Sequence, residues 1–256
     1  MDMTECIRLA IERIRVNRLR SMLTMLGIVI GVSAVITITT MGESLSKTLS
    51  STMSSLGNTD TVECYVQPEY PETDEEWETW IYPELEESDY LTLDELDGLK
   101  SSLSEYIDVV TVSSSLGQAT VTGPTYTTNI QLMATTKGYL EQNSLKLIMG
   151  RELSERDVKE HRPTAVVSDH FVKYACDGEN PIGSSISVSK GDGSIIKVYV
   201  VGIYEFNAQQ MSMLGSHTAE KDYATPMLLP YTFAADQSNG SLVADRIEYF
   251  SVLAKD

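Results

Sequence analysis

The chain of 256 residues has little cysteine and few patterns of residues that carry chemistry. Its cysteines, Cys6, Cys64 and Cys176, are far apart, so they form no disulfide framework, and pairing of Cys64 with Cys176 stays open. The three histidines are isolated, which leaves no zinc-type spacing. GxSxG, HExxH and P-loop motifs do not occur. The sequence therefore predicts no catalytic residue, no cofactor site and no metal site, and gives no support to a membrane-anchored hydrolase.

Charge is absent from the 22 residues between Arg20 and Glu43. At about 1.5 Å rise per residue, the 20 residues of 22–41 are long enough to cross a hydrocarbon core of roughly 30 Å as a helix. A cleavable signal peptide has a shorter apolar core and ends at a small-x-small cleavage site, which residues 41–45 do not provide. We therefore expect one uncleaved transmembrane helix over residues 22–41.

Positive charge is concentrated before this span, with Arg15, Arg18 and Arg20 as its cytoplasmic flank. Because positive charge stays inside, the N-terminus is expected to be cytoplasmic and the bulk of the chain extracytoplasmic, in a cell (inner or plasma) membrane crossed once. Within residues 1–21, apolar residues recur at helical spacing. Two interpretations stay open, an amphipathic helix in the inner-leaflet interface of the bilayer and an ordinary basic flank.

Basic residues are missing from the chain between Lys47 and Lys100. Residues 1–47 hold six Lys and Arg against four Asp and Glu, a net +2, whereas residues 48–256 hold 13 against 33, a net −20. These two values reproduce the total of −18. An external part this acidic excludes binding of nucleic acid through its phosphates and favours cationic partners.

Two features of the span and its continuation predict helix contacts. Gly27 and Gly31 form a GxxxG pattern, which allows a second helix to approach closely. After the span, apolar residues at helical spacing continue until Gly57 and Asn58. We expect a stalk helix over residues 42–57.

The acidic residues concentrate in residues 67–95, together with aromatic residues. One interpretation is a surface that captures a cationic, partly apolar ligand, with Trp77, Trp80, Glu75 and Glu76 as its candidate residues. The alternative is an exposed insertion that its charge keeps soluble. Both stay open at this point.

The rest of the chain alternates short strand and helix signals. A capping box at Thr92 begins a helix, and Ser168 caps another over residues 169–176. Strands are expected at residues 61–66, 107–112, 118–122, 126–135, 164–167, 185–189, 195–203 and 247–254. Most neighbouring strands are linked as hairpins, so the fold class predicted is α+β.

Several sequence blocks, in this order, resemble the MacB/FtsX-like family of ABC transporter permeases over residues 5–205. The most specific block is residues 17–32, NRLRSMLTMLGIVIGV. The others are Gly57, Met149-Gly150-Arg151 with Asp157, Ala165-Val166-Val167-Ser168, Asn180-Pro181-Ile182-Gly183-Ser184 and Val200-Val201-Gly202-Ile203. Residues 67–95 depart from the family pattern.

The resemblance implies an N-terminal membrane helix followed by a two-lobed, MacB-core-like extracytoplasmic domain. It assigns residues 58–135 with 224–256 to a first, βαβ-rich lobe and residues 136–223 to a second, β-rich lobe. It also implies a non-enzymatic permease that works as a dimer with a cytoplasmic ABC ATPase, for substrates such as antibiotics, peptides, toxins or lipoproteins. No second apolar run of about 18 residues occurs, so the family's three further membrane helices are not in this sequence, and three interpretations stay open: a fragment, a product whose other half is a separate chain, or a decayed copy.

The leading hypothesis is therefore an N-terminal permease half of an ABC-type exporter or mechanotransmission complex. Its expected partners are the ATPase, a second permease copy or a chain with the missing helices, and the lipid bilayer, but not nucleic acid. The alternative is a stand-alone, membrane-anchored binding module for cationic peptides.

Overall fold

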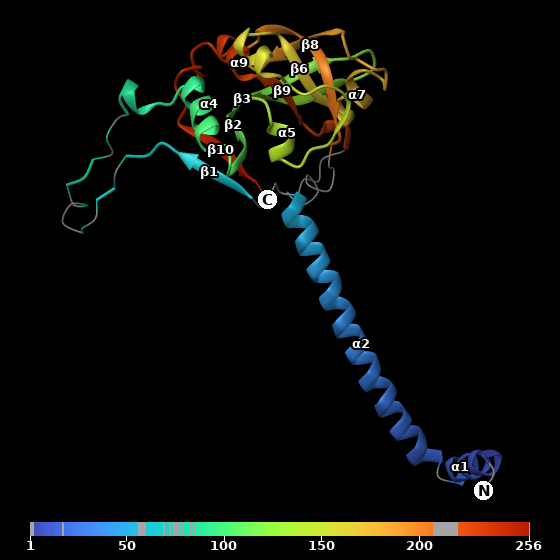
Figure 1. Cartoon of the computed structure of the whole chain (residues 1–256). Coiled ribbons are helices and arrows are strands. Elements are labelled where there is room, and N and C mark those ends of the chain that lie inside the picture. Colours follow the sequence, from blue (N-terminus) through green and yellow to red (C-terminus); the bar gives the residue numbers. More distant parts are fainter. Residues whose placement is uncertain are drawn as a thin grey trace. The chain divides into compact units, whose positions relative to one another are not determined.

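The structure is a computed structural model that describes residues 3–16, 18–55, 60–68, 70, 71, 73, 77, 79–81, 83, 85–206 and 220–255. The chain divides into two compact units, Met1–Thr52 and Met53–Asp256, and the second unit is called the head below. Figure 1 shows the helical first unit in blue and the strand-rich head in cyan to red.

The first unit contains α1 (Met3–Val16) and most of α2 (Arg18–Ser55), whose end from Met53 onward belongs to the head. No proline precedes Pro68, so nothing in the sequence removes a backbone hydrogen bond within the 38 residues of α2. The part of α2 over Arg18–Thr48 is long and apolar enough to cross a membrane, with a mean hydropathy of 2.2. The predicted span and stalk are thus one continuous helix as far as Ser55, whereas the predicted stop at Gly57 and Asn58 lies outside the described residues.

The described part of the head contains two sheets, and the chain passes directly from a strand of the first sheet into a strand of the second. The smaller sheet has the order β1-β10-β2, and both pairings are antiparallel. Its strands are β1 (Thr61–Tyr65), β2 (Ile107–Thr111) and β10 (Tyr249–Ala254). Helix α4 (Leu93–Ser102) packs on β2, as Figure 1 shows, and buries Leu96.

The larger sheet has the order β5-β8-β6-β9-β4-β3-β7, and β7 also pairs with β8. The six strands from β8 to β7 therefore close on themselves as a barrel, with β5 attached to β8. The strands are β3 (Ser113–Thr122), β4 (Thr127–Thr135), β5 (Leu147–Gly150), β6 (Thr164–Ser168), β7 (Ser185–Lys190), β8 (Ile195–Tyr204) and β9 (Thr225–Pro230). The short helices of the head are η1 (Glu87–Asp89), α5 (Tyr139–Gln142), α6 (Glu155–Lys159), α7 (Asp169–Ala175), η2 (Glu220–Asp222) and α9 (Tyr231–Asp236).

Alternation along the strands divides the apolar residues between two clusters. On β6, Val167 belongs to the main core whereas its neighbour Val166 faces a second cluster with Leu140 and Leu153. On β9, Leu229 belongs to the main core and Leu228 to the second cluster. Because side chains of successive strand residues point to opposite faces, one sheet supports both cores.

Most locally encoded elements agree with the sequence prediction, and the α+β class is confirmed. Thr92 caps α4 with a capping box, and Ser168 caps α7 by accepting the N–H of Phe171. The hairpins β3–β4 and β7–β8 are antiparallel as predicted. The prediction that most neighbouring strands are hairpin-linked is incomplete, because β4 pairs in parallel with β9 and β6 in parallel with β8.

The predicted boundary between two lobes does not follow the sheets. The barrel contains β3, β4 and β9, which were assigned to the first lobe, and β6, β7 and β8, which were assigned to the second. Residue 136, where the second lobe was expected to begin, lies between two segments that contribute strands to the same sheet. Strands from both predicted lobes are therefore hydrogen-bonded to one another in the same sheet.

Candidate functional site

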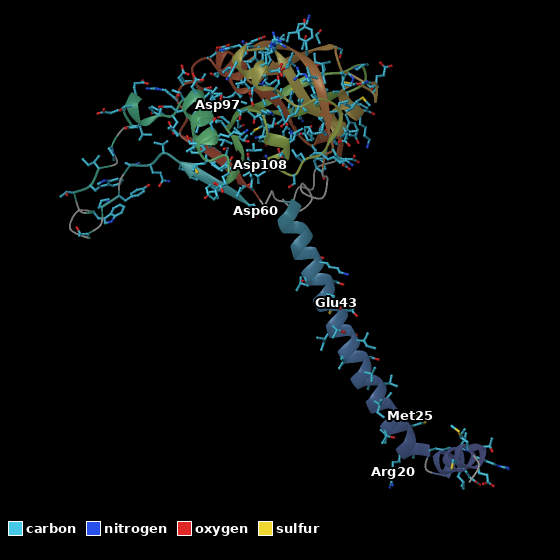
Figure 2. The ribbon with its side chains drawn as sticks, in the orientation of Figure 1. Arg20, Met25, Glu43, Asp60, Asp97 and Asp108 are labelled. Atoms are coloured by element: carbon cyan, nitrogen blue, oxygen red, sulfur yellow. The ribbon has the colours of Figure 1, made fainter. Side chains whose placement is uncertain are left out.

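The membrane-facing candidate is α2, whose described threonine hydroxyl groups donate to backbone carbonyls of the same helix. The Thr37 hydroxyl donates to the Ser33 carbonyl at 2.8 Å, and the Thr40 hydroxyl donates to the Ile36 carbonyl at 2.7 Å. Hydrocarbon offers no water to bond such groups, so internal bonding lowers their cost in a membrane. Figure 2 shows Arg20 near the start of α2, with Met25 and Glu43 farther along it. The helix chemistry is compatible with a bilayer.

The two glycines predicted to form a helix contact lie one turn apart on α2. A Cβ added at Gly27 or Gly31 would meet no atom within 4 Å, so their helix face is open to a close neighbour. The described residues contain no second membrane-length helix that packs there. The contact at Gly27 and Gly31 stays a prediction.

The predicted cytoplasmic flank is split between the two helices. Arg18 and Arg20 lie in the first turn of α2 and are exposed. Arg15 lies in α1, and its side chain is outside the described residues. The charged groups before the span therefore lie where an inner-leaflet headgroup region would be if the N-terminus is cytoplasmic.

The acidic segment places three aromatic rings together. Trp77 and Trp80 have ring centroids 5.3 Å apart, and the Tyr70 ring lies 6.1 Å from Trp77 and 5.6 Å from Trp80. Trp77 is 50% exposed. Glu75 and Glu76 lie outside the described residues. The sequence pointed to the two tryptophans but gave no reason to select Tyr70, which precedes Trp77 by seven residues.

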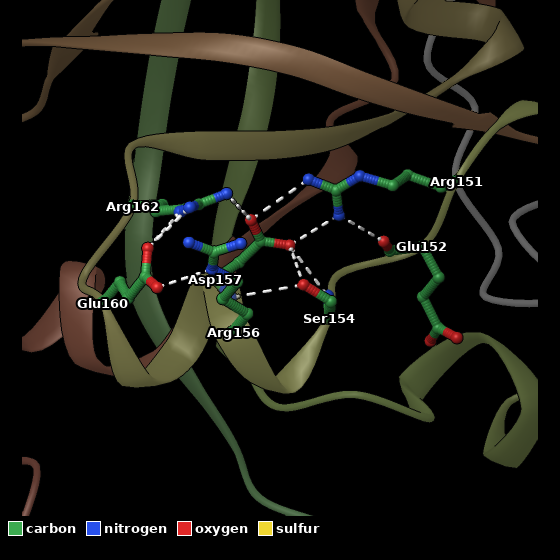
Figure 3. A network of polar contacts seen from close by, with 7 residues as sticks. All are labelled: Arg151, Glu152, Ser154, Arg156, Asp157, Glu160 and Arg162. Carbon is green, nitrogen blue, oxygen red and sulfur yellow. Dashed lines mark hydrogen bonds and ion pairs between the residues drawn. The ribbon is translucent and has the colours of Figure 1, made fainter.

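A network of hydrogen bonds and ion pairs in the head surrounds the buried carboxylate of Asp157 (Figure 3). Arg151 approaches it with both guanidinium nitrogens, Nη1 at 2.5 Å from Oδ2 and Nη2 at 3.1 Å from Oδ1. Ser154 donates its backbone N–H at 2.9 Å and its hydroxyl at 2.6 Å to Oδ2. The bonds between Ser154 and Asp157 form the capping box that begins α6.

This network keeps the carboxylate charged. Burial raises the pKa of Asp157, but the hydrogen bonds from Arg151 and Ser154 outweigh burial and lower the pKa to about 2. The Arg151 side chain is 47% exposed, so its guanidinium remains partly hydrated. The arrangement has no nucleophile and base in contact with an open site, and its geometry is that of a structural ion pair.

Close backbone contacts join this network to β8. Gly150 has a φ of +80°, and a Cβ there would lie 2.3 Å from the Val201 carbonyl oxygen. A Cβ at Gly202 would lie 2.2 Å from the Arg151 carbonyl oxygen. The Arg151 N–H donates to the Val201 carbonyl at 2.9 Å. The two sequence blocks that contain Gly150 and Gly202 are therefore neighbours in space and have little room for larger residues.

A mixed-charge cavity of about 210 Å³ lies between α4 and α6. Lys159 on α6 pairs with Asp97 on α4 at 3.4 Å, and Lys137 pairs with Glu155 at 3.7 Å. All four side chains are more than half exposed, so solvent weakens both pairs. Among the described residues no group of three His, Cys, Asp or Glu could hold a metal ion, and Cys64 and Cys176 are free thiols.

Comparison with models of known families identifies the family of the chain. The family model of the MacB-like periplasmic core domain matches residues 21–256. The chain belongs to this family. The match covers α2, both sheets of the head and the Arg151–Asp157 network, so the expected MacB/FtsX-like ABC permease family is confirmed. A periplasmic core domain that follows an apolar N-terminal helix indicates a membrane-anchored protein.

Individual relatives are ABC transporter components. The chain is 29% identical over 234 residues to an uncharacterized ABC transporter permease, YknZ, of Bacillus subtilis (strain 168), which covers 89% of this chain and 56% of the relative. It is 26% identical over 197 residues to a macrolide export ATP-binding/permease protein, MacB, of Aggregatibacter actinomycetemcomitans, covering 77% of this chain and 29% of that protein. The chain thus spans about half or less of the length of these relatives.

Two solved structures of transporter domains are similar to part of the chain. The periplasmic region of MacB from Actinobacillus actinomycetemcomitans has a TM-score of 0.48 and 20% identity, over 77% of this chain and 76% of that one. The extracellular domain of YknZ from Gram-positive bacteria also has a TM-score of 0.48, with 19% identity, over 77% of this chain and 84% of that one.

Proposed function

We propose that this chain is the N-terminal half of an ABC-type exporter or mechanotransmission permease, in which α2 couples ATPase-driven motion in the membrane to the head. The observation that carries the proposal is the unbroken course of α2 through the apolar span and on to Ser55. The membership of the chain in the MacB-like periplasmic core domain family supports a permease role.

The part of α2 beyond residue 41 is long enough to act as a lever. Its 14 residues, up to Ser55, correspond to about 21 Å at the usual helical rise. A continuous helix transmits displacement along and across its axis because every residue is fixed by backbone hydrogen bonds. Motion at the inner leaflet would therefore reach the residues that lead into the head.

A function of this kind requires partners. The proposal assigns ATP hydrolysis to a cytoplasmic ABC ATPase, and its further partners are a second permease copy or a chain that carries the family's other membrane helices. The N-terminus and Arg15, Arg18 and Arg20 would face the cytoplasm, and the head would be extracytoplasmic, with one membrane crossing in this chain. Gly27 and Gly31 would contact a partner helix.

A proline in the lever tests this coupling. Ser46→Pro removes a backbone hydrogen bond from α2 and costs about 3 kcal/mol of helix stability, whereas Ser46→Ala keeps the helix. The full chain is purified from its native membrane with the ATPase it retains, and cleavage of the head by added protease is compared with and without ATP. Wild type and Ser46→Ala should show ATP-dependent cleavage, and Ser46→Pro should lose it while ATP hydrolysis continues. Recovery of no ATPase, or an unchanged response in Ser46→Pro, would contradict the proposal.

A second candidate function is binding of cationic peptides by the acidic segment. The aromatic cluster of Tyr70, Trp77 and Trp80 favours it, because aromatic faces attract cations and the surrounding charge is negative. Such a role does not require the permease proposal.

The tryptophans make this second function simple to test. Trp77 and Trp80 are the chain's two tryptophans, so intrinsic fluorescence reports on this segment. Hexalysine added to the full chain in zwitterionic nanodiscs should change the emission, salt should weaken binding, and Trp77→Ala should lower affinity by roughly threefold. Hexaglutamate serves as the control. Binding of hexalysine without any change in tryptophan emission would place the cationic site elsewhere.

A further inference from the structure

One side of strand β3 is only partly covered. β4 pairs along the whole of β3 on one side. On the other side, β7 pairs with β3 at Ala119 and Thr120, and β10 pairs with the preceding strand β2 as far as Thr111. Residues 113–118 lie between these two pairings and have no strand partner on this side within the described part of the chain.

The backbone groups of this open edge can be assigned from the ladder. The Thr136 N–H donates to the Val112 carbonyl at 3.1 Å, so the backbone of Val112 faces the β4 side. Because successive residues of an antiparallel strand direct their N–H and C=O to alternate sides, those of Ser113 and Ser115 face away from β4. No other described residue makes a backbone hydrogen bond to these four groups. This side of β3 therefore has two unpaired backbone N–H donors and two unpaired C=O acceptors, one of each on Ser113 and on Ser115.

A groove of about 340 Å³ lies beside this edge, lined on one side by the start of β3 and on another by Tyr249 at the start of β10. Its walls include Tyr90, Tyr249, Leu242 and Val243, and Ser113 and Ser114 line it from β3. The walls thus provide aromatic and aliphatic surface next to unpaired backbone groups, which is the combination that strand-binding grooves use.

The charged groups in and beside the groove, Glu87, Arg246 and Glu248, sum to one negative charge. Arg246 is held by an ion pair to Glu87, and its guanidinium lies over the Tyr90 ring at 4.8 Å. Glu248 is exposed, lines the same groove and forms no ion pair with another described residue, although after Glu87 it also helps to raise the pKa of the Arg246 guanidinium. With the net −20 of residues 48–256, the groove favours a basic side chain.

We propose that this groove binds an extended peptide segment with a basic side chain, which adds as a short strand to β3 at Ser113 and Ser115. The register of β3 with β4 shifts between Ser115 and Gly117, and such a bulge bends the strand and interrupts the regular alternation of its backbone groups. The added strand is therefore short, and side-chain contacts with Tyr90, Tyr249 and Glu248 give the selectivity. This site is separate from the aromatic cluster at Trp77 and Trp80, and it does not depend on the coupling role of α2.

An N-methyl scan of a peptide tests strand addition directly. The probe is the fluorescein-labelled heptapeptide threonine-valine-threonine-lysine-threonine-valine-threonine, added to the full chain in zwitterionic nanodiscs and followed by fluorescence anisotropy. N-methylation of successive residues should weaken binding by roughly tenfold at alternate positions and little at the others. A period of two is expected because only alternate N–H groups of the peptide face β3.

Variants of the protein test the location. Ser115→Pro removes the edge N–H at a position where a strand tolerates proline, and Ser115→Thr keeps it. We expect roughly tenfold weaker binding for Ser115→Pro and little change for Ser115→Thr. Glu248→Gln should weaken binding of the lysine peptide by roughly threefold, so that this peptide no longer binds more tightly than a version with glutamate in place of lysine.

Several results would overturn the proposal. These are no binding of the lysine peptide at millimolar concentration, equal effects of N-methylation at every position, or identical affinities of Ser115→Pro and Ser115→Thr. Circular dichroism confirms that each variant is folded, and the N-methyl scan on the wild-type chain distinguishes the outcomes even if Ser115→Pro fails to fold. Self-association of the chain that displaces the peptide would replace the proposal with a contact between copies.

Discussion

Replacement of Gly202 by alanine is expected to lower the free energy of unfolding of the head by about 3–5 kcal/mol. Gly202 lies on β8, where it pairs with Gly150 of β5 and Val166 of β6. An added Cβ would lie 2.2 Å from the carbonyl oxygen and 3.0 Å from the carbonyl carbon of Arg151. Both atoms belong to the backbone, so the clash is relieved only by moving β5 away from β8. Urea unfolding of the full chain in micelles, followed by circular dichroism, measures the loss.

A matched control is the same substitution at Gly98. This glycine lies inside α4, and an added Cβ there would meet no atom within 4 Å. Gly98→Ala should raise stability by about 0.5–1 kcal/mol, because alanine favours the helix and restricts the unfolded chain. Wild-type stability of Gly202→Ala, or an equal loss in both variants, would show that Gly202 and Arg151 are not in tight contact.

Local signals in the sequence were sufficient for the elements that depend on neighbouring residues. The side chains of Thr92 and Glu95 each accept a hydrogen bond from the other residue's backbone N–H. Four consecutive residues are therefore enough to determine where α4 begins. Ser168 has the same role at the start of α7. The long uncharged run likewise predicted a continuous apolar helix, because its length and composition do not depend on tertiary contacts.

Pairings between distant segments could not be predicted in this way. β9 was not among the predicted strands, and it has Pro226 and Pro230 within it, residues that strands inside a sheet rarely contain. Its parallel pairing with β4 and the closure of the barrel by β7 arise from burial of both faces of the sheet. A division into lobes by sequence order cannot anticipate a sheet that takes strands from both halves.

The candidate sites show the same limit. The blocks with Gly150 and Gly202 were identified by resemblance, but their mutual contact is visible only once β5 lies beside β8. The edge of β3 gave no signal, because residues 113–118, SSSLGQ, are mainly polar, and residues 113–117 were not predicted as strand. An edge is unpaired because no other strand lies beside it, and the sequence of the strand itself does not indicate this.

Replacement of Asp157 by asparagine is expected to destabilise the head by about 2 kcal/mol at neutral pH. The bonds from Arg151 and Ser154 lower the pKa of Asp157 from 3.8 to about 2, in spite of its burial. A carboxyl group with a lowered pKa stabilises the fold above its unfolded pKa and loses that contribution as the pH falls towards its folded pKa. The stability difference between wild type and Asp157→Asn should therefore be full above about pH 5 and shrink between about pH 4 and pH 2.

The pH dependence separates this ion pair from a packing effect. Asparagine has nearly the same shape as aspartate, so a purely steric loss would give a difference that stays constant with pH. Asp192 provides the control, because its pKa is also lowered to about 2, first by the hydrogen bonds from Ser194, but its side chain is 43% exposed in a turn, where water screens it more than Asp157, although its ion-pair partner Lys190 is largely buried. Asp192→Asn should therefore change stability much less than Asp157→Asn at every pH. A pH-independent difference for Asp157→Asn, or equal effects of the two variants, would mean that the buried carboxylate and Arg151 do not hold the start of α6 through charge.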